Sequence, residues 1–358
     1  MSIVSPVAVT GCGVLSPAGT GLAALADHLA DGRTGNSEPH TPDAQEFPPH
    51  PVRALPEVDW DAHLGRKGRR VLDRSAAIGV VAAELALAEA NWPDEPTTSG
   101  VALGTAAGSL RTQIAVTQDT LRQDLPYLVN PAQIPNTVMN STAGHIAIRH
   151  QLKGVNATLS GGAASSLLAF RYARMAIALG RAERLLAGGV EELSAPYAWG
   201  WRQAELLPAT APMGEGCALF AVTDAATVEQ PAAELLACEI GLAGPQQRLG
   251  DSLAVRINRA LQRSGVTPED VGAVAVTASR NSGLARAEQL ALGATVGEQP
   301  RRIDTSAVVG DTYSASGALQ LAALLATWKR EDAAAGAIGL VTTVGPDGNV
   351  GCLVVRNR

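Results

Sequence analysis

Aromatic side chains and histidines are scarce in this chain. Aromatic residues make up 3% of the 358 residues, so a buried core must be built mainly from Ala, Val, Leu and Ile. The second half of the chain has no imidazole at all. The six histidines all lie in the first half, at His28, His40, His50, His63, His145 and His150.

Cysteines, basic charge and long apolar runs are also limited. The four cysteines are far apart and form neither a CxxC pair nor a metal-ligand spacing, which predicts reduced thiols and no metal site. No apolar run reaches membrane-spanning length, and residues 1–6 have no basic segment, so we expect a cytoplasmic protein that does not bind membranes. The formal net charge of −6 argues against a nucleic-acid-binding surface.

The sequence does contain a repeated alternation of short apolar runs and longer helical patterns. Strands are expected at residues 7–13, 101–104, 157–159, 185–190 and 217–222, and again at 235–240, 273–278, 302–304, 338–342 and 352–355. Helices are expected at 75–91, 166–179 and 317–328, and the Pro-rich segment 40–56 is expected to be a surface loop. This pattern predicts an α/β protein with two related halves, residues 1–225 and 226–358, packed as one body.

Several segments resemble the β-ketoacyl synthases of fatty-acid and polyketide synthesis. They are VAVTGCGVLSPAG at 7–19, RRVLDR at 69–74, ALGT at 102–105, PNTVMN at 135–140, ALGRAERLLAGGVEE at 178–192 and GEGCAL at 214–219. The resemblance covers nearly the whole chain in the expected order. It implies the thiolase-like fold, in which duplicated α/β halves form five layers, α/β/α/β/α, and it implies an obligate dimer.

The catalytic residues of that family are missing here. Active members have a Cys at the N-terminus of a buried helix, where the helix dipole and free N–H groups favour the thiolate. Ala163 stands at that position, Ser279 at the first active-site His, Ser306 at the Lys and Asp311 at the second His. The paired imidazoles stabilise an enolate, which a carboxylate at 311 would repel. We therefore predict no catalytic residue.

The glycine-rich loop near the C-terminus also departs from the family. Active members have a gating phenylalanine in this loop, and the corresponding position here holds Val344 or Pro346. Five expected groups are thus absent together.

A ketosynthase-like chain without its nucleophile resembles the chain length factor, the β subunit of heterodimeric type II polyketide ketosynthases. The resemblance implies that an active ketosynthase subunit binds acyl-carrier protein and condenses malonyl units. This chain would complete the heterodimer and contribute to the tunnel that holds the growing acyl chain, without a cofactor. Its short length fits the partner subunits of highly reducing, polyene-forming systems better than those of aromatic pathways.

A helix is expected after residues 101–104, at the position of the family's interface element facing the partner's tunnel. Leu110, Gln113, Ile114 and Thr117 follow one another at i, i+3, i+4 and i+7 spacing on it. They would either set the length of the product or serve as ordinary interface packing.

A basic cluster precedes the helix at 75–91. It could dock an acidic carrier protein by electrostatic attraction, or it could be a solvated face. The cluster consists of Arg66, Lys67, Arg69 and Arg70.

Two other interpretations remain open. One is a divergent ketosynthase or acyltransferase that uses Asp311, Ser279 or Arg280 in new chemistry, although neither serine lies in a recognisable triad and Asp311 could simply pair with an Arg or hold a loop. The other is a thiolase-like homodimer that binds acyl groups as a scaffold. Co-purification with an active ketosynthase separates the partner subunit from the scaffold.

Overall fold

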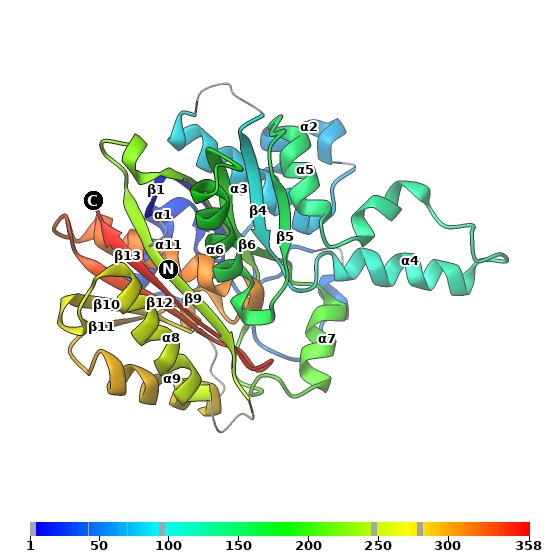
Figure 1. Cartoon of the computed structure of the whole chain (residues 1–358). Coiled ribbons are helices and arrows are strands. Elements are labelled where there is room, and N and C mark those ends of the chain that lie inside the picture. The colour runs from blue at the N-terminus through cyan, green and yellow to red at the C-terminus, as the bar shows by residue number, and fades with distance from the viewer. Residues whose placement is uncertain (1–4, 42, 70, 93–96, 245–248, 278–281) are drawn as a thin grey trace.

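The structure, a computed structural model, describes residues 5–41, 43–69, 71–92, 97–244, 249–277 and 282–358. Most of its strands form one large sheet in the order β11-β10-β12-β13-β9-β1-β8-β6-β4-β5, with the short β2 (Gly19–Thr20) added beside β1. Helices cover both outer faces, and two helices lie between the two halves of the sheet (Figure 1). The layer order α/β/α/β/α confirms the expected fold class.

The two halves repeat one strand arrangement. In each half a long strand pairs antiparallel with a second, the second pairs antiparallel with a third, and two parallel strands complete the edge. The first half has β1 (Val7–Ser16), β8 (Gly216–Asp224), β6 (Arg184–Glu191), β4 (Ser99–Gly104) and β5 (Asn156–Leu159). The second half has β9 (Ala233–Leu242), β13 (Asn349–Asn357), β12 (Ile338–Val344), β10 (Val271–Val276) and β11 (Arg301–Asp304).

The helices divide into three layers and a set of connecting elements. The outer layers contain α3 (Arg74–Ala90) and α5 (Ser141–Arg149) on one side, and α8 (Leu249–Ser264) and α9 (Ser282–Thr295) on the other. The middle layer contains α6 (Ser165–Ala178) and α11 (Ser316–Arg330). The remaining helices are α1 (Gly21–Ala30), α2 (Trp60–Arg69), α4 (Leu110–Arg122), α7 (Ala195–Gln203) and α10 (Ser306–Val309).

Small side chains allow these layers to approach closely. The middle helix α11 is buried along nearly its whole length, and more than half of its buried residues are alanine or glycine or carry short polar side chains. On the other face of the first half, a side chain at Gly13 would overlap with the backbone oxygen of Ala82 in α3. Gly13 is therefore required by the close contact of β1 with α3.

Each strand and helix predicted from the sequence is present, with ends that differ by a few residues. The strand expected at 273–278 ends at Val276, because the N–H of Thr277 donates to the carboxyl group of Glu288 instead of to a neighbouring strand. The predicted boundary at 225 falls between β8 and β9, which belong to the same sheet. The predicted division into units 1–225 and 226–358 therefore does not separate two sheets. It stays a prediction that one fold contains two related halves.

The prediction that residues 40–56 form a surface loop is wrong in part. This segment contains a 3₁₀ turn, η1 (Ala44–Glu46), and a short strand, β3 (Val52–Arg53), which pairs with β7 (Met213–Gly214). Val52, Ala54 and Leu55 are buried as a result. Proline content alone did not indicate this pairing, because it depends on a strand more than 150 residues away.

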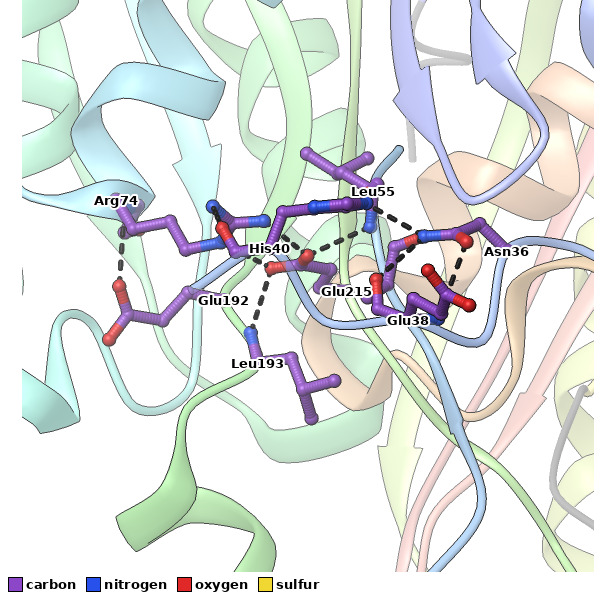
Figure 2. A network of polar contacts seen from close by, with 10 residues as sticks. Asn36, Glu38, His40, Leu55, Arg74, Glu192, Leu193 and Glu215 are labelled. Carbon is purple, nitrogen blue, oxygen red and sulfur yellow. Dashed lines mark hydrogen bonds and ion pairs between the residues drawn. The ribbon is translucent and has the colours of Figure 1, made fainter. Parts of the chain in front are cut away.

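A buried ion pair holds this segment to the sheet (Figure 2). Glu215 is fully buried, and its two carboxylate oxygens accept hydrogen bonds from Nε and Nη2 of Arg74 at 2.8 and 2.6 Å. The same carboxylate accepts the backbone N–H groups of Leu55 (2.8 Å) and Leu193 (3.2 Å). Asn36 continues the network by donating to the backbone oxygens of Ala54 and Leu55. Both oxygens of the Glu215 carboxylate thus accept hydrogen bonds from the Arg74 guanidinium and from backbone N–H groups.

We predict that Arg74→Met lowers the free energy of unfolding by about 3 kcal/mol, because it leaves the buried Glu215 carboxylate without its counter-charge. Denaturant titration measures this value. The control is Arg33→Met, which removes an exposed pair with Asp31 and is expected to cost less than about 1 kcal/mol. Equal losses in the two variants would show that the buried pair has no special role.

Three other buried glutamates have a carboxyl pKa that is raised by burial. Glu191 ends β6, Glu192 follows it directly, and Glu288 lies on α9. Burial raises the pKa of Glu191 and of Glu192 to about 8, and burial raises the pKa of Glu288 to about 6 although Thr342 and Thr277 donate hydrogen bonds to it. The folded protein therefore retains protons that the unfolded chain, with ordinary pKa values of 4.5, has already lost.

The sign of this linkage gives a pH prediction. These three carboxyl groups bind more protons in the folded than in the unfolded state between pH 4.5 and 8, so their contribution to the free energy of unfolding should fall as pH rises through this window and should outweigh the opposite contribution of His145 and His150. Glu288→Gln should flatten the part of the curve between pH 4.5 and 6, whatever it does to absolute stability. Urea unfolding at half-unit pH steps measures both slopes, and a wild-type curve that rises across this window would contradict the prediction.

Candidate functional site

Ala163 lies where the resemblance places the nucleophile. It belongs to the 3₁₀ turn η3 (Gly162–Ala164), which follows β5 and leads directly into α6. The Ser165 hydroxyl stabilises this turn by accepting from the N–H of Gly161 (3.0 Å) and donating to the oxygen of Gly162 (2.7 Å). The turn that would present a thiol at a helix N-terminus is therefore intact, but it presents a buried methyl group.

The loop after β12 covers this turn. Gly162 has φ of +54°, and a side chain on it would overlap with the carboxylate of Asp347 and would also meet the hydroxyl of Tyr313. The Tyr313 hydroxyl donates to Oδ2 of Asp347 (3.2 Å), and Asn349 donates to the same carboxylate through its backbone N–H and its side chain (both 3.0 Å). Asp347 and Tyr313 thus close the space over Gly162.

Asp311 and Trp201 fix the position of Tyr313. Tyr313 begins the 3₁₀ turn η7 (Tyr313–Ala315) with φ of +44°, a conformation that is costly for a bulky residue. Oδ1 of Asp311 accepts a hydrogen bond from the N–H of Tyr313 at 2.9 Å. The ring of Trp201 in α7 packs edge-on against the Tyr313 ring, with 4.9 Å between the ring centroids. Burial, with the nearby Asp347 charge, raises the pKa of the Tyr313 phenol well above its usual range. Asp311 therefore holds a loop here.

The other predicted positions are only partly described. Ser306 is the first residue of α10, is buried, and has its N–H bonded to Oδ1 of Asp304 at 2.8 Å. Val344 is buried in the second half of the sheet. Ser279 and Arg280 lie outside the described residues. The structure brings η3, η7 and the end of β12 together, so Ala163 and Asp311 belong to one site, which we call the relict site.

The described part of the chain offers no activated thiol at the relict site. Cys217, Cys238 and Cys352 are buried within strands, and burial raises the pKa of each thiol. Burial likewise raises the pKa of Cys12, which lies in β1. A nucleophile needs a lowered pKa or an adjacent base.

The described residues contain no group of three or more His, Cys, Asp or Glu side chains that could hold a metal ion. No described helix has the length and apolarity to cross a membrane.

The four predicted tunnel residues lie on α4, which projects from the body with the 3₁₀ segment η2 (Pro131–Thr137) beside it (Figure 1). We call residues 110–138 the arm. Leu110 packs against the apolar cluster around Trp201, and Nε2 of Gln113 donates to the oxygen of Ala107 at 3.1 Å. Ile114 and Thr117 are exposed. The first two therefore hold the helix to the body, and the last two are free to face another molecule.

The first half has two further surfaces that another molecule could cover: the unpaired edge of β5 and a set of exposed apolar side chains. β5 is the outermost strand of the sheet on its side and pairs only with β4 among the described residues. Large apolar side chains are exposed on α5 and α6, which pack against β5, and along the arm. They are Ile148, Met175, Leu179, Leu121, Leu125, Tyr127, Leu128, Ile134 and Val138. Such surfaces are typical of protein–protein interfaces.

The predicted basic cluster has mixed charge in the structure. Arg66 and Arg69 are exposed at the end of α2, and Arg69 pairs with Asp61 at 3.3 Å. Arg70 and the side chain of Lys67 lie outside the described residues. A surface hollow beside Arg69 is also lined by Glu57, Asp59 and Asp61, so acidic groups surround this end of α2.

Sequence reasoning missed three side chains of this region. Tyr313 and Asp347 lie within the segments compared with the family, but only the fold brings them over Gly162. Glu192 also lies within a compared segment, and nothing in the sequence indicated that its carboxyl group bonds to two helices.

Comparisons with known proteins agree with this geometry. The family model described as "Beta-ketoacyl synthase, N-terminal domain" matches residues 4–229. The tetracenomycin polyketide synthase ketoacyl synthase beta subunit of Streptomyces glaucescens is 30% identical over 362 residues, with 91% of this chain and 86% of that protein covered. The 3-oxoacyl-[acyl-carrier-protein] synthase 2 of Rhizobium meliloti (strain 1021) is 26% identical over 358 residues, with 88% and 84% covered.

A solved structure agrees closely with the whole chain. A chain of the structure titled "The ishigamide ketosynthase/chain length factor" superposes with a TM-score of 0.87 and 33% identity, covering 98% of this chain and 99% of that one. The family model, the relatives and this superposition all point to the same assignment. The chain therefore belongs to the β-ketoacyl synthase family and has its thiolase-like fold.

Proposed function

We propose that this chain is a chain length factor, the non-catalytic β subunit that pairs with an active ketosynthase in a type II polyketide synthase. The single observation that carries this proposal is the relict site. Ala163 stands where the resemblance places the nucleophile, and Asp347 and Tyr313 occupy the space over the neighbouring Gly162. The likeness to a ketoacyl synthase beta subunit and to a ketosynthase/chain length factor structure supports the same role.

The chemistry available at the relict site supports a non-catalytic role. Decarboxylative condensation needs a thiolate to hold the acyl chain and donors that stabilise an enolate. The described groups next to this turn are instead the carboxylate of Asp347 and the phenol of Tyr313, whose backbone N–H is bonded to the carboxylate of Asp311. Two carboxylates would raise the energy of an enolate, so the condensing step is assigned to the partner subunit.

The open surfaces of the first half support obligate pairing. Pairing along β5 would satisfy its free edge, and the exposed side chains of α5, α6 and the arm would be buried with it. Ile114 and Thr117, which face away from the body, would then lie against the partner's tunnel and limit the length of the growing chain. Leu110 and Gln113 would support them from behind.

Delivery of the growing chain is also assigned to the partner. One relative is by name a synthase that acts with acyl-carrier protein, so the complex is expected to use carrier-bound substrates. Acidic residues surround Arg69 in this chain, and they would weaken the attraction of an acidic carrier protein. Docking at the basic cluster of this subunit therefore has less support than docking at the ketosynthase.

Because the relict site is closed, a thiol introduced at position 163 is expected to react slowly. Ala163→Cys should react slowly with iodoacetamide, because the position is buried and the Asp347 carboxylate closes the space over the neighbouring Gly162. The double variant Ala163→Cys/Asp347→Ala should react at least about tenfold faster. Peptide mass spectrometry distinguishes position 163 from the native Cys12. Acylation of the single variant by carrier-bound substrate, followed by condensation, would contradict the proposal.

The pairing surface predicts which apolar side chain matters for the complex. Leu121→Arg places a charge at the exposed side of the arm and should weaken binding to a ketosynthase encoded beside this chain by about tenfold or more, equivalent to about 1.4 kcal/mol. Leu290→Arg changes an equally large exposed side chain on α9, away from this surface, and should leave binding unchanged. Co-purification and interferometry measure both values.

A chain that forms a homodimer and ignores the ketosynthase, with or without Leu121, would contradict the pairing. That result would instead favour an acyl-binding scaffold.

A further inference from the structure

The arm has almost no core of its own. No residue of α4 is buried, and its main neighbours are η2 and the helix α7. A helix without a buried face receives little support from packing. The direction in which α4 leaves the body must therefore depend on its first turn, where it joins β4 and the rest of the fold (Figure 1).

That first turn is not capped by its own side chain. Ser109 occupies the N-cap position, but its hydroxyl lies within hydrogen-bond distance of the Thr112 hydroxyl (2.8 Å) and of Oε1 of Glu192 (3.4 Å) and caps no helix N–H. The N–H of Arg111 is directed instead to Oε1 of Glu192 at 3.4 Å. The acceptor at this helix terminus thus comes from the end of β6.

The second oxygen of the same carboxyl group serves the core helix α3. The N–H of Ser75 donates to Oε2 of Glu192 at 3.1 Å, while Asp73, the N-cap of α3, accepts from Ala76 at 2.7 Å. One buried carboxyl group therefore connects the first turn of α3, the first turn of α4 and the end of β6. Helix α3 is buried against β1 and β8, so it is a rigid reference for the arm.

We propose that Glu192 is the positioning residue of the arm: its carboxyl group joins the first turn of α4 to the first turn of α3 and so sets where Ile114 and Thr117 lie. The consequence for product length rests on the proposed function. The positioning itself does not, because it is a property of this chain alone.

The side chains around Glu192 form a buried, charged environment at the start of α3 and α4. Glu192 is buried, with Asp73, Glu215 and Arg111 as the charged groups around it. Burial, helped by Asp73, raises its pKa to about 8, whereas Arg111 acts in the opposite direction. The bridge between the two helices rests on its hydrogen bonds to the N–H groups of Ser75 and Arg111.

Hydrogen exchange of the full-length chain tests the proposal. In Glu192→Ala the amides at the start of α4 should exchange about fivefold faster, the loss expected when the acceptor at a helix N-terminus is removed. Glu288→Ala is the matched control, because it removes another buried carboxyl group with a raised pKa from the opposite half. It should leave α4 exchange unchanged. Glu192→Gln keeps one acceptor and should give a smaller increase at the same amides.

The outcomes separate the two claims. Equal α4 exchange in wild type and both Glu192 variants, or an equal increase in Glu192→Ala and Glu288→Ala, would overturn the positioning role. In the complex with the ketosynthase, Glu192→Ala should broaden the distribution of product lengths, and Glu288→Ala should lower yield without broadening it. Faster α4 exchange with an unchanged product distribution would support positioning by Glu192 and count against the assigned role of the arm in setting chain length.

Discussion

The carboxyl end of β6 is the point on which the relict site, the arm and the 40–56 segment all depend. Glu191 accepts from the Ser314 hydroxyl in η7, Glu192 bonds to the first turns of α3 and α4, and the N–H of Leu193 donates to Glu215, which holds Leu55. Carboxyl groups this deeply buried are stable only when donors surround them or a proton neutralises them. One end of β6 therefore connects these three regions of the fold through hydrogen bonds to buried carboxyl groups.

The chain has the fold of a condensing enzyme, but different side chains stand at the relict site. The turn before α6 and the buried helix behind it are those that would favour a thiolate. Ala163 stands where the resemblance places the nucleophile, and Asp347 and Tyr313 fill the space over the neighbouring Gly162. The fold alone would suggest an enzyme, whereas the proposal of a partner subunit rests on these site residues. Exposed apolar side chains on the arm and the free edge of β5 suit that role, because both need a second molecule to cover them.

Local sequence patterns predicted the strands, the main helices and the position of Ala163, because each depends on neighbouring residues or on a family motif. They did not predict that Leu55 is buried, since β3 pairs with β7 far along the chain. They also missed the contact of Tyr313 with Asp347, which are 34 residues apart, and the two helices that meet at Glu192. Such contacts arise only when distant segments pack, and no periodicity or spacing encodes them.

Intact-protein mass spectrometry of the complex is the most direct test of the account. The chain would be co-purified with a ketosynthase encoded beside it and exposed to acyl groups carried on acyl-carrier protein. The account predicts a 1:1 complex in which the added acyl mass appears on the ketosynthase alone, with elongated product formed only when both subunits are present. Acyl mass on this chain, or elongation by this chain without the ketosynthase, would contradict it.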